Sequence, residues 1–253
     1  ADDEWDMLRT GFRLDGRLGD SDDITVQGDF YDGTVGSGAT AITSVFPAVT
    51  SDFSIDDHVR GGNVLMRWSR EFSEDSSATL QAYYDRTERE IITFEETRDT
   101  IDLDFQHGIK LLDWNRLTWG AGYRWTRDHT GDTVGVQFRD RSRTGHLATG
   151  FLQDEVTLFD DLLRIIVGSK FEYNSYTGFE FQPSARLVVV PNEHHTLWGS
   201  VSRAVRTPSR ADDDVGINLT AEAMTLTLPT ATPPFFVDIP YTLLGRVEGQ
   251  RGF

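Results

Sequence analysis

Apolar and polar residues alternate with a period of two along most of the chain. In the segment IDLDFQHGIKL (101–111), every odd position except His107 is apolar, and every even position is polar or glycine. The segments LTWGAGYRW (117–125) and LLRIIVGSKFEY (162–173) follow much the same alternation. Such alternation is typical of a β-strand with one apolar and one polar face. No segment shows the 3.6-residue spacing of apolar residues that indicates a helix as clearly as it shows this alternation.

The pattern predicts an all-β protein, an antiparallel meander of about ten long strands that forms part of a transmembrane β-barrel. Its connections are alternately short and long. One end with tight turns and another with long loops is typical of such barrels, whereas the Greek-key crossings of a soluble sandwich would break this order. The expected strands are 5–16, 22–33, 61–73, 77–89, 98–111, 115–127, 144–159, 162–174, 181–190 and 195–206. Short turns are expected at 18–21, 73–76, 112–115, 160–161 and 191–194, and long connections at 34–60, 90–97, 128–143, 175–180 and from 207 onward.

Strand length agrees with a bilayer. Residues 101–111 would extend about 34 Å at a rise of ~3.4 Å per residue, and a tilt of roughly 45° reduces this to about 24 Å, close to the ~25 Å apolar band of outer-membrane barrels. The strand predicted at 195–206 carries Arg203 and Arg206 at its long-loop end, where they can reach lipid headgroups or water. Two features disagree with the pattern. His107 falls on the apolar face, and the uneven phase of 146–159 suggests a β-bulge near Gln153–Asp154.

Composition excludes several classes of protein. The chain has 253 residues, no cysteine and a net charge of −17. Disulfides and thiolate metal sites are therefore impossible, and a nucleic-acid partner is disfavoured because phosphate binding needs a positive surface. No apolar run is long enough for a transmembrane helix. Since no signal peptide is visible at Ala1, we expect either a mature chain or a piece of a longer one.

Several motifs together resemble the barrel region of bacterial TonB-dependent outer-membrane receptors. They are Phe151-Leu-Gln153-Asp154-Glu155, Gly168-Ser-Lys-Phe171, Pro183-Ser-Ala-Arg186-Leu187 and Arg206-Thr-Pro208-Ser209, with similar strands at 22–33 and 61–72. The resemblance covers most of residues 5–210. It implies a Gram-negative outer-membrane protein that contacts membrane lipid and takes up a scarce small ligand, such as a siderophore, cobalamin or an oligosaccharide.

The resemblance also implies a 22-stranded barrel, with an N-terminal plug domain through which a TonB-type partner acts. Since no plug precedes Ala1 and about ten strands are present, we expect residues 1–253 to be a partial barrel domain, open rather than closed. Residues 207–245 are expected to be a long external loop within it.

Two alternatives remain open at this point. Ten-stranded outer-membrane proteases place an Asp–His pair and a second acidic pair at their rim, so Asp128-His129 with Asp212–Asp214 could form an enzyme site if they face each other. A soluble extracellular β-sandwich is the other alternative. Strand order distinguishes these: an open sheet with two unpaired edges favours the receptor, and a closed ten-stranded barrel favours the enzyme.

No residue is assigned a catalytic, cofactor-binding or metal-binding role, and the protein is not expected to be an enzyme. His194-His195 are adjacent, so on a strand their side chains point to opposite faces, which is poor metal geometry. The segment GSGAT (36–40) lacks the lysine of a phosphate-binding loop. Aromatic residues are expected on the lipid face or at the membrane boundaries; they are Trp5, Tyr31, Trp68, Tyr83, Tyr84, Trp114, Trp119, Tyr123, Trp125, Tyr173 and Trp198.

Overall fold

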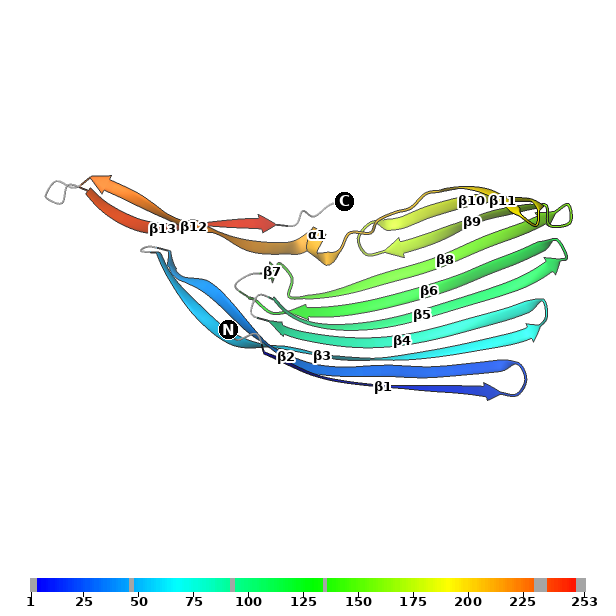
Figure 1. Ribbon diagram of the computed structural model, residues 1–253, viewed down its shortest axis with the longest axis horizontal. Helices are drawn as coiled ribbons and strands as arrows, with labels where there is room; N and C mark the ends of the chain where they lie inside the picture. The colour runs from blue at the N-terminus through cyan, green and yellow to red at the C-terminus, as the bar shows by residue number, and fades with distance from the viewer. Residues whose placement is uncertain (1–3, 46–47, 92–93, 134–135, 230–235, 249–253) are drawn as a thin grey trace.

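The computed structural model describes residues 4–45, 48–91, 94–133, 136–229 and 236–248. Most of them form one long, curved β-sheet, with a smaller three-stranded sheet at one end (Figure 1). The large sheet consists of β1 (Trp5–Leu18), β2 (Asp22–Val45), β3 (Ala48–Ser73), β4 (Ser76–Ile91), β5 (Phe94–Leu112), β6 (Asn115–Thr130), β8 (Ser142–Leu158), β9 (Leu163–Asn174), β10 (Gly178–Asn192) and β11 (His195–Ser202). The small sheet consists of β7 (Val136–Phe138), β12 (Val215–Pro229) and β13 (Phe236–Glu248), and the helix α1 (Arg210–Asp214) precedes β12.

The ten strands of the large sheet lie in chain order, and each is antiparallel to its neighbours. Strands β1 and β11 are its two edges, and within the described residues they do not pair with each other. The prediction of an open, all-β meander is therefore confirmed. A closed ten-stranded barrel, on which the enzyme alternative depends, would pair β1 with β11, and the described residues do not show this pairing. Figure 1 shows a single curved layer rather than the two layers of a sandwich.

All five short turns lie at one end of the sheet, as predicted (Figure 1). The opposite end, the long-loop end, differs from the prediction at each of its connections: residues 175–177 form a short turn between β9 and β10, and β7, β12 and β13 lie within the connections expected at 128–143 and from 207 onward. Strands β2 and β3 pair as far as Val45 and Ala48, so most of the expected loop 34–60 is a projecting hairpin. Strands β4 and β5 likewise pair up to Ile91 and Phe94. An antiparallel hairpin can lengthen as long as both strands keep their ladder of hydrogen bonds, whatever the polarity of the side chains.

The two faces of the large sheet have opposite character. Because antiparallel partners project to the same side, one can follow a row of paired residues across several strands. One such row is Leu80, Phe105, Ala121, Gly150, Phe171 and Phe181, and the adjacent row on the opposite side is Gln81, Asp104, Gly122, Thr149, Glu172 and Glu180. We call these sides the apolar face and the polar face.

Burial is inverted relative to a soluble protein. Among the described residues, Ala78 is the only buried hydrophobic residue, whereas Asp128, Glu172, Arg210 and Asp214 are buried, and large apolar side chains are exposed over the whole apolar face. A contiguous exposed apolar surface of this extent marks contact with another apolar medium. No helix in the described part of the chain has the length and apolar character needed to cross a membrane.

His107 lies on the apolar face with both ring nitrogens engaged. The indole Nε1 of Trp119 donates to its Nδ1 at 3.1 Å, and Ser76 Oγ lies 2.9 Å from its Nε2. Because an indole N–H can only donate, His107 must carry its proton on Nε2 and donate it to Ser76. Its ring also meets Phe72 edge to face. A polar ring is accommodated on this face because its neighbours satisfy both of its nitrogens.

The bulge expected near Gln153–Asp154 is absent. Strand β8 keeps an unbroken register with β6 and with β9 through this region. The uneven phase has another cause, because Phe151 lies on the polar face directly across from Gly120. A Cβ on Gly120 would lie 2.5 Å from Cε1 of Phe151, so the ring occupies the space that the glycine leaves open.

Six of the eleven predicted aromatics lie on the apolar face, including Trp68, Trp119 and Tyr173, whereas Trp114 lies in the turn between β5 and β6 and the other four lie on the polar face. Residues Trp5, Tyr31, Tyr83 and Trp198 belong by register to the polar face. Tyr31 covers Gly61, as Phe151 covers Gly120, and Trp198 lies beside the guanidinium of Arg186 at 5.9 Å. Aromatic residues in this sheet therefore have two roles besides contact with lipid. Some cover a glycine on the neighbouring strand, and others pack against the guanidinium of an arginine.

Candidate ligand-binding site at the long-loop end

A cavity of about 810 Å³ lies on the polar face at the long-loop end. Strands β4, β5 and β6 line it together with β7 and the segment 208–217, which come from distant parts of the sequence. Six charged residues line the cavity: Asp85, Arg89, Glu96, Arg98, Asp128 and Arg210. Three aromatic residues also line it, namely Phe94, Phe138 and Tyr176. This mixture suits a ligand that offers both polar groups and flat apolar surface.

Arg210 holds the segment 208–217 against the sheet. Its side chain is only 6% exposed, and it donates hydrogen bonds to the carboxylate of Asp128 and to the main-chain oxygen of Asp140. Its guanidinium also lies over the ring of Phe138 at 4.5 Å. Asp214, which is fully buried, has its Oδ1 3.8 Å from Nε of Arg210. One buried cation thus joins β6, β7, the segment before β8 and helix α1.

The local sequence explains why a helix begins at this point. Ser209 is the N-cap of α1, and its side chain accepts a hydrogen bond from the main-chain N–H of Asp212. In return, the Asp212 carboxylate accepts hydrogen bonds from the main-chain N–H and the hydroxyl of Ser209, both at 2.8 Å. This reciprocal capping box fixes the first turn of the helix and thereby directs Arg210 inward. The same hydrogen bonds lower the pKa of Asp212.

A second cation–aromatic contact lies beside the cavity. The guanidinium of Arg143 lies 4.4 Å from the ring centre of Tyr176 and donates to Asp213 at 2.5 Å. Burial raises the pKa of Tyr176 above its ordinary value, so its hydroxyl stays protonated at neutral pH. The cavity therefore has a phenol that can donate as well as accept a hydrogen bond.

The residues considered for catalysis do not form a catalytic site. Asp128 points into the cavity, but His129 follows it on the strand and belongs to the opposite face. The structure does bring Asp213 and Asp214 near this end of β6, but each lies beside an arginine, Arg143 or Arg210. Each of these carboxylates thus faces an arginine rather than His129, so the two facing pairs that such a catalytic site needs are not formed.

The histidine pair lies at the opposite end of the sheet, where His194 is in the turn before β11 and His195 is the first residue of that strand. Asn192 Oδ1 accepts a hydrogen bond from the main-chain N–H of His194 at 3.0 Å and lies 2.8 Å from Nδ1 of His195. The pair therefore lies at the boundary between this turn and β11. Within the described residues, no group of three or more histidine and acidic side chains is arranged to hold a metal ion.

Sequence reasoning missed Arg98, Phe138, Tyr176 and the inward direction of Arg210. One signal was available, because a serine followed three residues later by an aspartate, as at Ser209 and Asp212, can start a helix. For Phe138 and Tyr176 the sequence carries no comparable signal, since each lies on or near a loop whose path depends on tertiary contacts. Arg98 lies on the polar side of the predicted strand 98–111, but nothing in its local sequence marks it as a cavity residue.

Comparisons with known proteins agree with this architecture. The model of the TonB dependent receptor-like β-barrel family matches residues 1–235. The fold is similar to the siderophore receptor PirA from Pseudomonas aeruginosa, with a TM-score of 0.54, 13% identity, and coverage of 85% of this chain and 47% of that one. It is also similar to PirA from Acinetobacter baumannii, with a TM-score of 0.54, 12% identity, and coverage of 99% and 56%. No curated protein sequence matches the chain.

The chain spans about half the length of these two solved structures. An apolar face that meets lipid, a polar face that meets an aqueous lumen, and unequal hairpin ends are the features of an outer-membrane barrel wall. Since the family model covers nearly the whole described sheet, the match concerns the barrel itself. The chain belongs to the TonB-dependent receptor family, whose members are outer-membrane transporters of Gram-negative bacteria rather than enzymes, and it forms part of their β-barrel.

Proposed function

We propose that this chain supplies barrel wall and ligand-facing surface to a receptor that takes up a scarce small ligand, with a ferric siderophore as the first candidate. Cobalamin or an oligosaccharide is the alternative ligand. Energy would come from a TonB-type partner acting through a plug domain. The observation that carries this proposal is the cavity of about 810 Å³, which opens on the lumenal, polar face at the long-loop end.

The lining of the cavity supports a siderophore over an oligosaccharide. Arg89 and Arg98 can pair with anionic oxygens, and Phe94 and Phe138 offer flat surfaces, with their ring centres 6.2 Å apart. Sugar sites depend more on neutral hydrogen-bonding groups, and here charged groups outnumber them. The two similar solved structures are both described as siderophore receptors.

We further propose that residues 207–245 act as an external loop that helps to form this cavity. Long loops of outer-membrane barrels face the exterior, and β12 of this segment pairs with β7, whose Val136 and Phe138 line the cavity. Arg210 anchors the beginning of the loop to β6. The loop would therefore present one wall of the cavity to incoming ligand while its base stays fixed.

Binding to the full-length receptor tests the proposal. Quenching of tryptophan fluorescence is measured with ferric catecholate, hydroxamate and carboxylate siderophores, cobalamin and a maltooligosaccharide. Substituting Arg98→Gln should weaken binding of the preferred siderophore by about tenfold, because a charged hydrogen bond contributes ~1.5–3 kcal/mol. The matched control is Arg116→Gln, which lies on the same face near the short turns. Saturable binding of only cobalamin or the oligosaccharide, or equal loss in both variants, would contradict the siderophore assignment.

A further inference from the structure

The charges that line the cavity of about 810 Å³ at the long-loop end, which we call the lumenal cavity, are balanced. The lining holds three carboxylates and three guanidiniums, which belong to Asp85, Glu96, Asp128, Arg89, Arg98 and Arg210. A cavity that binds a strongly anionic ligand is expected to carry an excess of cations, because a carboxylate beside a guanidinium cancels much of its field. The charge balance therefore bears on the kind of siderophore that this cavity admits.

Two of the three arginines in the lining already have a carboxylate partner. Arg98 donates a hydrogen bond to Glu96 at 2.5 Å, although its own side chain is 44% exposed. Arg210 donates to Asp128, and both side chains are buried. The third arginine, Arg89, is exposed and lies directly across from Glu96 in the register of β4 and β5. Arg89 and Arg98 thus keep N–H groups for a ligand oxygen, but each lies close to a negative charge.

The residues behind the lining add no net positive charge. Arg143 and Asp213 form an ion pair at 2.5 Å and cancel each other. Asp214 is fully buried, and its Oδ1 lies 3.8 Å from Nε of Arg210, which already pairs with Asp128. Asp214 therefore leaves this region with one carboxylate in excess. Among the described residues, an anion that enters the cavity meets no surplus of cations.

Ferric siderophores differ in charge according to their chelating groups. A hydroxamate carries a single negative charge when it binds Fe³⁺, so a ferric complex with three hydroxamates is neutral. A catecholate carries a double negative charge, so the corresponding complex is a trianion. Moving a trianion out of water is costly where no surplus of cations compensates it. A neutral complex avoids this cost, and its oxygens can still accept hydrogen bonds from the exposed guanidiniums and from the Tyr176 hydroxyl.

We propose that the lumenal cavity selects ferric trishydroxamate complexes, which have no net charge, over trianionic triscatecholate complexes. This inference rests on the proposed function, since it names the ligand class for the same cavity. Arg89 and Arg98 would donate to oxygens of the complex, while Asp85 and Glu96 would repel a net negative charge. Selectivity would therefore depend on the carboxylates of the lining as well as on its arginines.

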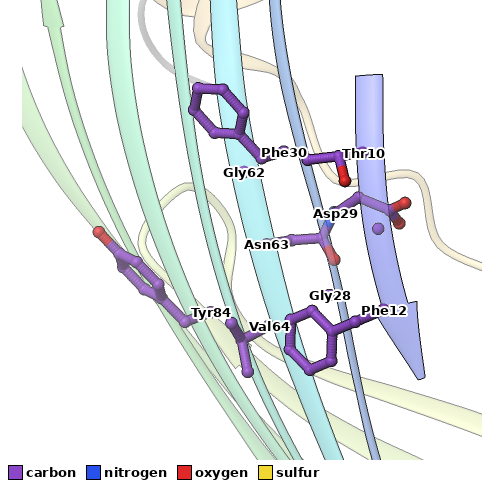
Figure 2. A pocket seen from close by; sticks show the side chains of 10 residues that line it. Thr10, Phe12, Gly28, Asp29, Phe30, Gly62, Asn63, Val64 and Tyr84 are labelled. Carbon is purple, nitrogen blue, oxygen red and sulfur yellow. The ribbon is translucent and has the colours of Figure 1, made fainter. Parts of the chain in front are cut away.

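A second cavity must be distinguished from the lumenal cavity in the test. This groove of about 370 Å³ runs across β1 to β4 on the apolar face. Figure 2 shows Gly28 and Gly62 between the rings of Phe12 and Phe30, with Val64 alongside. A neutral complex is less strongly excluded from such an apolar surface than a trianion is. Val64→Phe narrows the groove and leaves the lumenal cavity unchanged, so it reports any binding to the groove.

The test compares two forms of one trishydroxamate complex that differ mainly in charge. N-acetyl ferrioxamine B is neutral, and N-succinyl ferrioxamine B carries a single negative charge; ferric enterobactin provides a trianionic triscatecholate. Binding to the full-length receptor is measured by quenching of tryptophan fluorescence. The neutral form should bind about tenfold more tightly than the succinyl form and about 100-fold more tightly than ferric enterobactin. In about 0.5 M NaCl the affinity for the neutral form should change by less than about twofold, because screening acts on net charge.

A charge variant tests whether the lining causes this preference. Asp85→Asn removes a negative charge and preserves the shape of the side chain, so the succinyl form should then bind within about threefold of the neutral form. Asp104→Asn is the matched control, because Asp104 is exposed on the same face of β5 but does not line the cavity. Neither Asp104→Asn nor Val64→Phe should alter the preference or the affinity for the neutral form.

The possible failures of the two proposals can be told apart. Tighter binding of ferric enterobactin or of the succinyl form would overturn the charge selection and leave the siderophore assignment intact. So would an equal effect of Asp85→Asn and Asp104→Asn, or a loss of binding in Val64→Phe. Saturable binding of cobalamin or a maltooligosaccharide alone would contradict the proposed function, and this inference with it.

Discussion

The guanidinium of Arg210 donates a hydrogen bond to the carboxylate of Asp128, although the two residues are 82 positions apart in sequence. The pair is buried, and it joins the outer end of β6 to the segment that leads into β12. Removing one partner of a buried ion pair is costly because the remaining charge loses its compensation. This contact therefore determines whether the segment stays on the wall.

Replacing Arg210 by alanine should release residues 203–217 from the sheet. Asp128 and Asp214 would lose the guanidinium beside them, and we expect about 3 kcal/mol of local stability to be lost. Hydrogen exchange measured by mass spectrometry should become about 100-fold faster in this segment. The control is Arg206→Ala, whose side chain is 85% exposed and pairs with Asp212 at 3.4 Å; a surface pair contributes little. Similar exchange in the two variants would show that Arg210 is not the anchor.

Gly120 should not tolerate a larger residue. A Cβ at this position would lie 2.4 Å from the main-chain oxygen of Phe105 and 2.5 Å from Phe151. Overpacking of this kind typically costs about 1–3 kcal/mol, so Gly120→Val should lower the temperature at which the folded species disappears on semi-native gels. Gly150→Ala is the control, because the nearest atom to its Cβ is 3.8 Å away. Equal melting of the two variants would contradict the packing argument.

The tautomer of His107 can be observed directly. Nitrogen-15 NMR of histidine-labelled receptor should show the proton on Nε2 and an acceptor at Nδ1, because the Trp119 indole donates to Nδ1. Trp119→Phe should shift the Nδ1 resonance and destabilise the barrel by about 1 kcal/mol. Trp114→Phe, in the turn between β5 and β6, should leave the resonance unchanged. A proton found on Nδ1 in the unmodified receptor would refute this hydrogen-bond pattern.

The cap of α1 should respond to acid. The main-chain N–H and hydroxyl of Ser209 lower the pKa of Asp212 below its ordinary value of 3.8 because they donate to the ionised carboxylate. The stabilisation is therefore complete above pH 3.8 and is lost as the pH falls through the lowered pKa. The amide resonances of Ser209 and Asp212 should titrate with a midpoint below 3.8, and Ser209→Ala should raise that midpoint. A midpoint at or above 3.8 in the unmodified receptor would rule out the capping box.

The part of the fold that crosses the membrane could be predicted from the sequence. Between Tyr84 and Ser76, or Ile101 and Leu111, every side chain faces either hydrocarbon or water, so polarity alternates and strand positions follow. Outside the membrane both faces meet water. The part of β2 and β3 that extends beyond the membrane, up to Val45, therefore has no alternation of polarity from which its strands could be predicted.

The candidate site was much less predictable. Arg210 and Asp128 meet through the path of a long connection, and nothing in their local sequence indicates the contact. The expected bulge was wrong because an aromatic residue on the polar face, Phe151, was taken as a loss of register, although it covers a glycine on the neighbouring strand. An alternation of polarity analysed within one strand cannot show which residues lie opposite each other on neighbouring strands.

Within the described residues, each strand of the large sheet pairs only with the strand of that sheet that comes before or after it along the chain. A complete β-hairpin is thus a modular unit: its duplication or loss preserves the direction of every other strand and the orientation of every other side chain. Gain or loss of one strand would instead reverse the chain relative to the membrane, and this accounts for the even strand numbers of single-chain bacterial barrels. Pores of different diameter can therefore evolve from such a wall in steps of two strands.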